Sequence, residues 1–70
     1  MEKNFKEILL ELMNYKNLNQ TTIAKAVGVK QSQVSEWLNG KCKPGYDILK
    51  SMAENLDVSA EYLLGLSDEF

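Results

Sequence analysis

Apolar residues recur along this chain at the spacing of helices rather than that of strands. Near its start, five of them follow the i, i+3, i+4, i+7, i+8 spacing that forms one stripe on an amphipathic helix: Phe5, Ile8, Leu9, Leu12 and Met13. Asn4 is suited to cap this helix, and polar residues interrupt the period near residues 15–17. The pattern therefore predicts a first helix over this segment.

Two short helices are predicted on either side of Gly28. The first follows Asn19, a good N-cap, is about eight residues long and ends at Gly28, because glycine adopts the left-handed conformation there without a steric penalty. Its buried face is apolar: Ile23, Ala24 and Val27. The second runs from Gln31 to Leu38, where Val34 and Trp37 lie three residues apart and share an inward face.

The rest of the chain predicts two more helices and no strand. Residues 41–45 include proline and glycine and are predicted to form a loop. A fourth helix then carries its own apolar stripe: Tyr46, Leu49, Met52, Ala53 and Leu56. Ser59 caps a short fifth helix that ends at Gly65. The expected fold is all-α, a compact five-helix orthogonal bundle in one domain over residues 1–70, with an ordered core of about residues 4–66.

The composition argues against most catalytic and metal chemistry. Of the 70 residues, 44% are hydrophobic, which suffices for one small core, and there is one cysteine and no histidine. An internal disulfide, a Ser-His or Cys-His pair and a thiolate or imidazole metal site are therefore excluded. We expect no enzymatic activity, no metal, no cofactor and no small-molecule substrate.

Membrane and export signals are also missing from the sequence. No apolar run approaches the roughly 18 residues needed to span a bilayer. The N-terminus lacks the basic start and apolar stretch of a signal peptide. We therefore expect a cytoplasmic protein of bacterial or phage origin with no membrane partner.

Charge is unevenly distributed along the chain. The net charge is −2, although nucleic-acid-binding domains are usually basic. Residues 16–50 carry six lysines and two acidic residues, a net charge of +4, whereas residues 51–70 carry five acidic residues and no lysine. Because the local field steers binding to phosphates, the basic middle of the chain is compatible with a nucleic-acid partner.

Several short motifs follow one another in a characteristic order. The two helices around Gly28 are followed by N-G-K-x-K-P and later by V-S-A-E-Y-L-L-G. The most specific positions are Gln20, Ile23, Ala24, Gly28, Val29, Val34, Ser35, Trp37, Asn39, Gly40, Lys41, Pro44, Ala53, Leu56, Leu63, Leu64 and Gly65. In this order the chain resembles the phage-repressor and Cro type of helix-turn-helix protein, with its lambda-repressor-like DNA-binding domain, over about residues 5–67.

The resemblance implies a helix-turn-helix module in the second and third helices. In this motif the second helix of the pair enters the major groove of double-stranded DNA, and its first residues meet base edges. With Val34 and Trp37 buried, the outward edge of helix 31–38 carries the expected base-reading residues: Gln31, Ser32, Gln33, Ser35 and Glu36. A plain solvated helix face is the alternative interpretation of these residues.

Gln31 is the expected principal base reader, because its amide can bond adenine N6 and N7 as a bidentate pair. The family counterpart of Gln20 contacts the DNA backbone and braces this first reader. Five residues are expected at phosphates, where contacts set the register without reading sequence: Gln20, Lys30, Asn39, Lys41 and Lys43. Solvated loop charge is the alternative for the lysines.

Three features depart from the family pattern. Lys30 stands where Ser or Thr commonly caps the third helix, so we expect a nearby phosphate to offset the cation beside the helix N-terminus. Leu38 stands where an acidic residue is common, so a hydrophobic contact is expected there in place of an ion pair. The chain contains no arginine, which removes the commonest guanine-reading side chain.

The expected function is sequence-specific DNA binding by a transcriptional regulator, a repressor, on a palindromic operator. One helix reads few base pairs, so we expect a homodimer on half-sites about 34 Å apart. Its interface is expected at apolar residues that exceed what so small a core can bury: Tyr62, Leu64, Leu66 and Phe70. Two alternatives stay open: a protein-interaction module without DNA binding, favoured by net acidity and Glu36, and an antitoxin-type regulator.

Overall fold

The computed structural model describes residues 4–69, and these residues form five α-helices and no strand. The helices are α1 (Phe5–Lys16), α2 (Gln20–Val27), α3 (Gln31–Leu38), α4 (Tyr46–Asn55) and α5 (Ala60–Leu63). The prediction of an all-α fold with five helices is confirmed. The helix of about eight residues before Gly28 and the helix from Gln31 to Leu38 have the expected bounds.

Side-chain caps set the beginnings of three helices. Asn4, Asn19 and Ser59 each accept a hydrogen bond from the backbone N–H three residues later, at 2.9, 2.8 and 3.1 Å. Such a cap satisfies one N–H that the helix itself leaves without a partner and contributes about 1 kcal/mol. Gly28 ends α2 with a φ of 82°, the left-handed conformation that glycine adopts freely. These four residues act as the sequence predicted.

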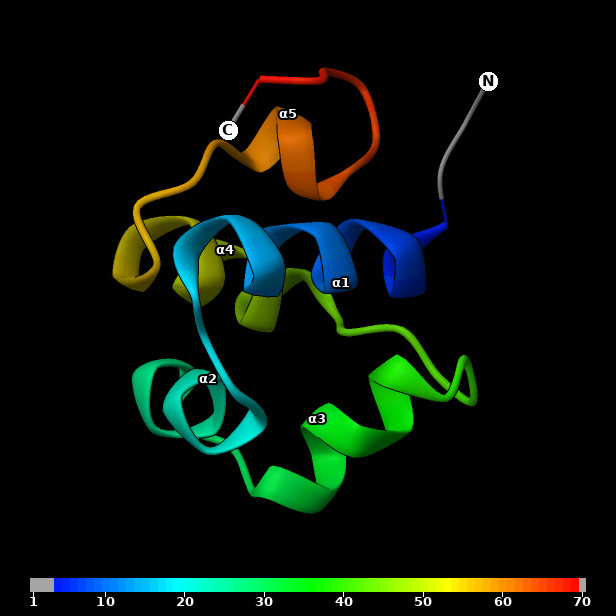
Figure 1. Ribbon diagram of the computed structural model, residues 1–70, viewed down its shortest axis with the longest axis vertical. Coiled ribbons are helices and arrows are strands. Elements are labelled where there is room, and N and C mark those ends of the chain that lie inside the picture. Colours follow the sequence, from blue (N-terminus) through cyan, green and yellow to red (C-terminus); the bar gives the residue numbers. More distant parts are fainter. Residues whose placement is uncertain (1–3, 70) are drawn as a thin grey trace.

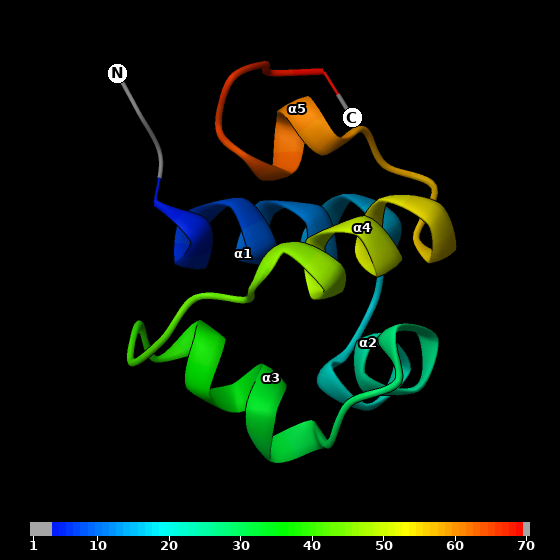
Figure 2. The ribbon, with the colours of Figure 1, turned by 180° about the vertical axis from the view of Figure 1, so that it is seen from behind.

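α1 crosses the middle of the molecule and separates its two ends (Figure 1). On one side of α1 lie α2 and α3, which pack against each other; on the other side lies α5 with the chain that follows it. The reverse view shows α4 on the far side of α1 (Figure 2), where it packs against α2 and α5. α3 therefore forms one end of the molecule and α5 the other.

α3 is anchored through its inward face. Trp37 is 2% exposed, and its ring meets the ring of Phe5 edge to face with centroids 6.1 Å apart. Such a pair contributes about 0.5–1.5 kcal/mol beyond the burial of its surface. Leu38 packs against the edge of the core, which is the hydrophobic contact expected at this position. Trp37 is thus a core residue that fixes α3 on α1.

Candidate nucleic-acid interface

α3 turns one edge outward because its opposite edge, with Val34 and Trp37, is buried. The five expected base readers differ in exposure. Gln31, Ser32 and Glu36 are exposed, and Gln33 and Ser35 are half-buried. The exposed edge belongs to the helix that forms one end of the molecule (Figure 1). The fold therefore presents the polar edge of α3 without obstruction from α1 or α5.

The first residues of α2 and α3 are joined through their side chains. Nε2 of Gln31 donates a hydrogen bond to Oε1 of Gln20 at 2.8 Å. This contact is the brace that the resemblance implied. It uses one N–H of the Gln31 amide and leaves the second N–H and Oε1 for another partner. The bond leaves the amide N–H groups of Gln20 unused.

Backbone and side-chain bonds fix the orientation of α2, and with it that of α3. The N–H groups of Gly28 and Val29 both donate to the carbonyl of Ala24, at 2.9 and 3.0 Å. From α4, Nδ2 of Asn55 donates to the carbonyl of Ala26 at 2.8 Å. The turn between α2 and α3 is therefore held from inside by its own backbone and from behind by α4.

A second side-chain bond links α3 to the loop that follows it. Nε2 of Gln33 donates to Sγ of Cys42 at 3.3 Å. The sequence did not predict this contact, because nothing in the spacing of Gln33 and Cys42 shows that the loop turns back beside the middle of α3. The contact restrains the loop that also carries Lys41 and Lys43.

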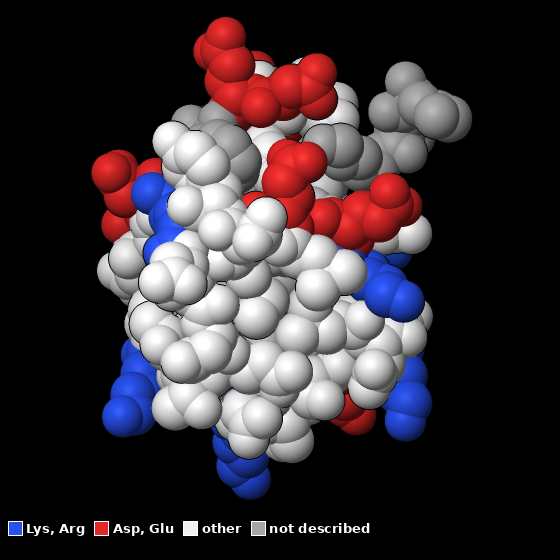
Figure 3. Space-filling view, viewed as in Figure 1, with Lys and Arg blue, Asp and Glu red and all other residues white. Residues whose placement is uncertain are grey.

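The residues expected at phosphates surround α3. Lys30 occupies the N-cap of α3 and makes no side-chain cap bond, and Asn39 occupies its C-cap. Both are exposed, as are Lys41 and Lys43 in the following loop. Figure 3 shows lysines around the end formed by α2 and α3, and most of the acidic side chains on this face toward the end formed by α5. The charge separation along the sequence is therefore also a separation in space.

No cluster of metal-ligating side chains accompanies this surface in residues 4–69. Within them no three Cys, Asp or Glu side chains gather as a metal-binding group. In the same part of the chain, no helix combines the length and the apolar character needed to cross a membrane. The chemistry available at α3 is that of amides, hydroxyls, one carboxylate and lysines.

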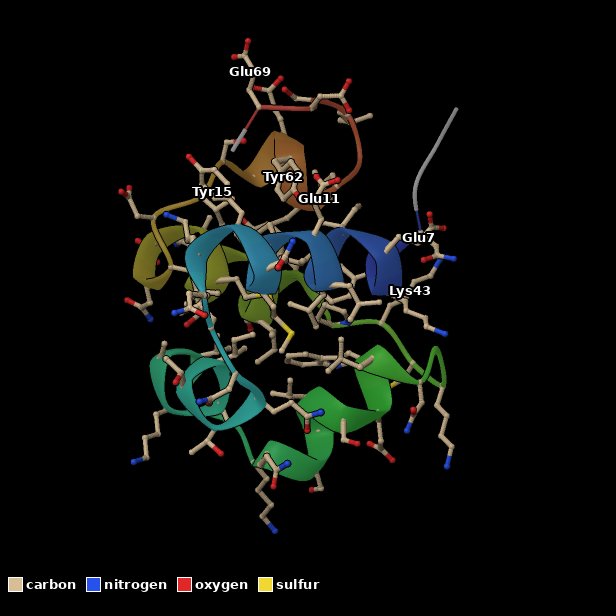
Figure 4. The ribbon with its side chains drawn as sticks, in the orientation of Figure 1. Glu7, Glu11, Tyr15, Lys43, Tyr62 and Glu69 are labelled. Carbon is tan, nitrogen blue, oxygen red and sulfur yellow. The ribbon has the colours of Figure 1, made fainter. Side chains whose placement is uncertain are left out.

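Tyr62, expected at the dimer surface, is buried instead. It is 1% exposed, and its hydroxyl donates to Oε1 of Glu11 at 2.6 Å and to the carbonyl of Ile8 at 3.4 Å. Figure 4 shows it between α5 and α1, beside Glu11. Burial, followed by the Glu11 carboxylate, raises the pKa of Tyr62 above its usual range. The expectation for Tyr62 was wrong, because the α1–α5 contact gives its ring a place in the core and its hydroxyl an acceptor.

The other residues of the expected dimer surface differ from Tyr62. Leu64 is 57% exposed and Leu66 is 71% exposed. Phe70 lies outside the described residues. Leu64 and Leu66 therefore remain accessible to another chain at the end of the molecule opposite α3.

Comparison with known proteins gave one family and one solved structure. Residues 9–63 match a family model described as helix-turn-helix. A crystal structure of a transcriptional regulator from Listeria innocua superposes with a TM-score of 0.80 at 26% sequence identity and covers 100% of this chain. The chain spans 65% of that protein's length. No curated protein sequence matches the present chain.

Proposed function

The chain belongs to the helix-turn-helix family of the phage-repressor and Cro type, and on that premise we propose that it is a transcriptional regulator, a repressor, that binds a specific double-stranded DNA sequence. α3 enters the major groove and the lysines around it contact the phosphates. The regulator from Listeria innocua, which shares the fold, supports a regulatory role. The paired amides of Gln20 and Gln31 are the observation that carries the proposal.

Gln31 is the principal base reader in this proposal. Its Oε1 accepts from adenine N6, and the N–H not used by Gln20 donates to adenine N7, an arrangement that contributes about 1–3 kcal/mol of discrimination. Because the 2.8 Å bond to Gln20 already holds the amide, less side-chain freedom is lost when DNA binds. A reader fixed in this way favours one base over others rather than adapting to each.

Four further α3 residues complete the reading edge. Ser32 can bond either kind of base, Glu36 accepts from cytosine N4, and Gln33 and Ser35 lie at the flank of the helix. Phosphate contacts by Gln20, Lys30, Asn39, Lys41 and Lys43 set the register of α3 in the groove. Specificity then resides in amide, hydroxyl and carboxylate contacts, without arginine.

A homodimer on a palindromic operator follows from the size of the reading edge. One α3 contacts only a few base pairs, and two copies on half-sites about 34 Å apart double the contacts. The described residues extend 29 × 24 × 23 Å, so copies lying side by side fit successive major grooves on one face of DNA. The exposed Leu64 and Leu66 support self-association. Occupation of the operator by this dimer is the basis for repression.

An interaction module is the second candidate, and Glu36 favours it. This carboxylate is exposed on the reading edge of α3, where it repels phosphates. In that case the acidic end near α5 binds a partner protein, as in an antitoxin-type regulator.

Selection of bound duplexes from a random DNA pool separates the two candidates. The proposal predicts enrichment of a palindrome whose half-sites contain adenine at a fixed position, and loss of that preference in Gln31→Ala. Recovery of duplexes with no common sequence would refute specific DNA binding.

A further inference from the structure

An apolar groove lies between α4 and α5. Its volume is about 240 Å³, and its lining is Tyr46, Leu49, Lys50, Ala53, Glu54, Ala60 and Leu64. Tyr46 is 78% exposed and Leu64 is 57% exposed. Exposed apolar side chains that lie together beside a groove, rather than scattered singly, are typical of interaction sites.

We propose that a second copy of this chain occupies this groove, with the two α4 helices antiparallel about a two-fold axis. The proposal rests on the proposed function, whose homodimer it places on α4 and α5 instead of on α5 and the tail. Leu64 belongs to both surfaces. Tyr62 points from α5 toward α1, where it is buried, and takes no part.

The charges at the groove favour a second copy of the same chain as the occupant. Lys50 and Glu54 are exposed, lie four residues apart on α4 and line the groove together. In an antiparallel pair, Lys50 of each copy lies opposite Glu54 of the other, so two ion pairs of opposite direction form. A two-fold interface requires such self-complementarity. A partner carrying charge of a single sign would leave Lys50 or Glu54 opposite a like charge.

The direction of α4 makes this arrangement compatible with DNA binding. α4 runs across the long axis of the molecule, and α3 lies at one end of that axis (Figure 2). A two-fold axis parallel to that long axis reverses α4 in the second copy and leaves both α3 helices at the same end. Both reading edges then face one side, as a palindromic duplex requires.

The groove is lined by seven residues, fewer than the roughly 20–30 that each side of a stable interface contributes, so we expect the free protein to associate weakly. Stable dimers bury about 800 Å² on each partner, roughly one sixth of the 4719 Å² accessible here. We expect a monomer–dimer equilibrium that shifts with protein concentration and further toward the dimer on DNA.

Sedimentation equilibrium of charge-swapped variants tests the proposal. Lys50→Glu and Glu54→Lys each put like charges at both of the symmetry-related contacts between positions 50 and 54. We expect each variant to weaken dimerisation roughly tenfold. An equimolar mixture should recover wild-type association. In the mixed dimer the introduced glutamate faces the introduced lysine, and native Glu54 faces native Lys50. Lys25→Glu, the same charge change at an exposed position on α2, is the matched control and should leave association unchanged.

Equal association of all variants, failure of the mixture to recover, or a wild-type monomer both free and on DNA would overturn the proposal. Binding of each variant to a duplex with a single half-site separates this failure from failure of the proposed function. If the groove proposal fails and half-site binding persists, specific DNA recognition stands and the dimer surface lies elsewhere.

Discussion

The side-chain amide of Gln31 is bonded to that of Gln20 at 2.8 Å, across the turn between α2 and α3. The two residues are eleven positions apart and each begins its helix. This bond joins the residue expected to read a base to the residue expected to contact a phosphate. In the proposed complex, recognition of the base and placement on the DNA backbone are therefore mechanically connected.

Replacing Gln31 by alanine should reduce sequence discrimination more than affinity for unrelated DNA. The expected loss is about 1–3 kcal/mol of discrimination, measured by titrating operator and unrelated duplexes. Gln20→Ala should cause a smaller loss, and the double variant should lose less than the sum of the two because the residues act together. Asn14→Ala, which removes an exposed amide from α1, is the control. Additive effects would show that the brace has no role in reading.

Replacing Lys41 by alanine should weaken binding to every duplex by a similar factor. A phosphate contact carries no sequence information, so the ratio between operator and unrelated DNA should stay constant. The slope of log K against log salt should become less steep by about one unit for each copy bound. A change in base preference would assign Lys41 to base reading instead.

Replacing Lys30 by serine should move stability and DNA affinity in opposite directions. Position 30 is the N-cap of α3 with extended φ and ψ of −77° and 149°, and it has no side-chain cap bond. A serine hydroxyl can supply that bond, which stabilises by about 1 kcal/mol, while loss of the lysine removes a phosphate contact. Thermal unfolding should show a higher Tm, and operator titration a weaker affinity. Unchanged affinity would show that Lys30 is a solvated side chain that contacts no phosphate.

Stability should fall at alkaline pH because of Tyr62. Its pKa is raised in the folded protein, mainly by burial, whereas an unfolded tyrosine loses its proton near pH 10. The folded state thus keeps a proton that the unfolded state releases, so this contribution to stability is complete below about pH 10 and is lost as the pH rises further.

Tyr62→Phe isolates that effect. Below pH 9 it should cost about 1–3 kcal/mol, because the bond to Glu11 disappears, and the alkaline fall should become shallower. Tyr46→Phe, at an exposed tyrosine, is the control in denaturant unfolding at pH 8 and pH 11. Equal alkaline losses in wild type and Tyr62→Phe would contradict the assignment.

Local chemistry explains why much of the fold could be predicted. Asn19 and Gly28 bound α2 with side-chain and backbone preferences that need no tertiary contact, and the spacing of Val34 and Trp37 fixes which edge of α3 faces outward. The brace between Gln20 and Gln31 came from the family resemblance, since spacing alone does not show that the two helix starts meet.

Tertiary contacts explain what could not be predicted. The burial of Tyr62 depends on α5 packing against α1, and its acceptor Glu11 is 51 residues away in sequence. The Gln33–Cys42 bond depends on the path of the loop after α3. The α4–α5 groove arises from two helices whose separate patterns indicate only that each has an apolar face.

The measurement that tests DNA recognition most directly is the salt dependence of binding to the duplex enriched from the random pool. With Lys30, Lys41 and Lys43 of two copies at phosphates, log K should fall linearly with log salt at a slope of about −5. The operator should remain preferred over unrelated DNA throughout. Failure of every duplex to bind at low salt would contradict the account and favour the interaction module.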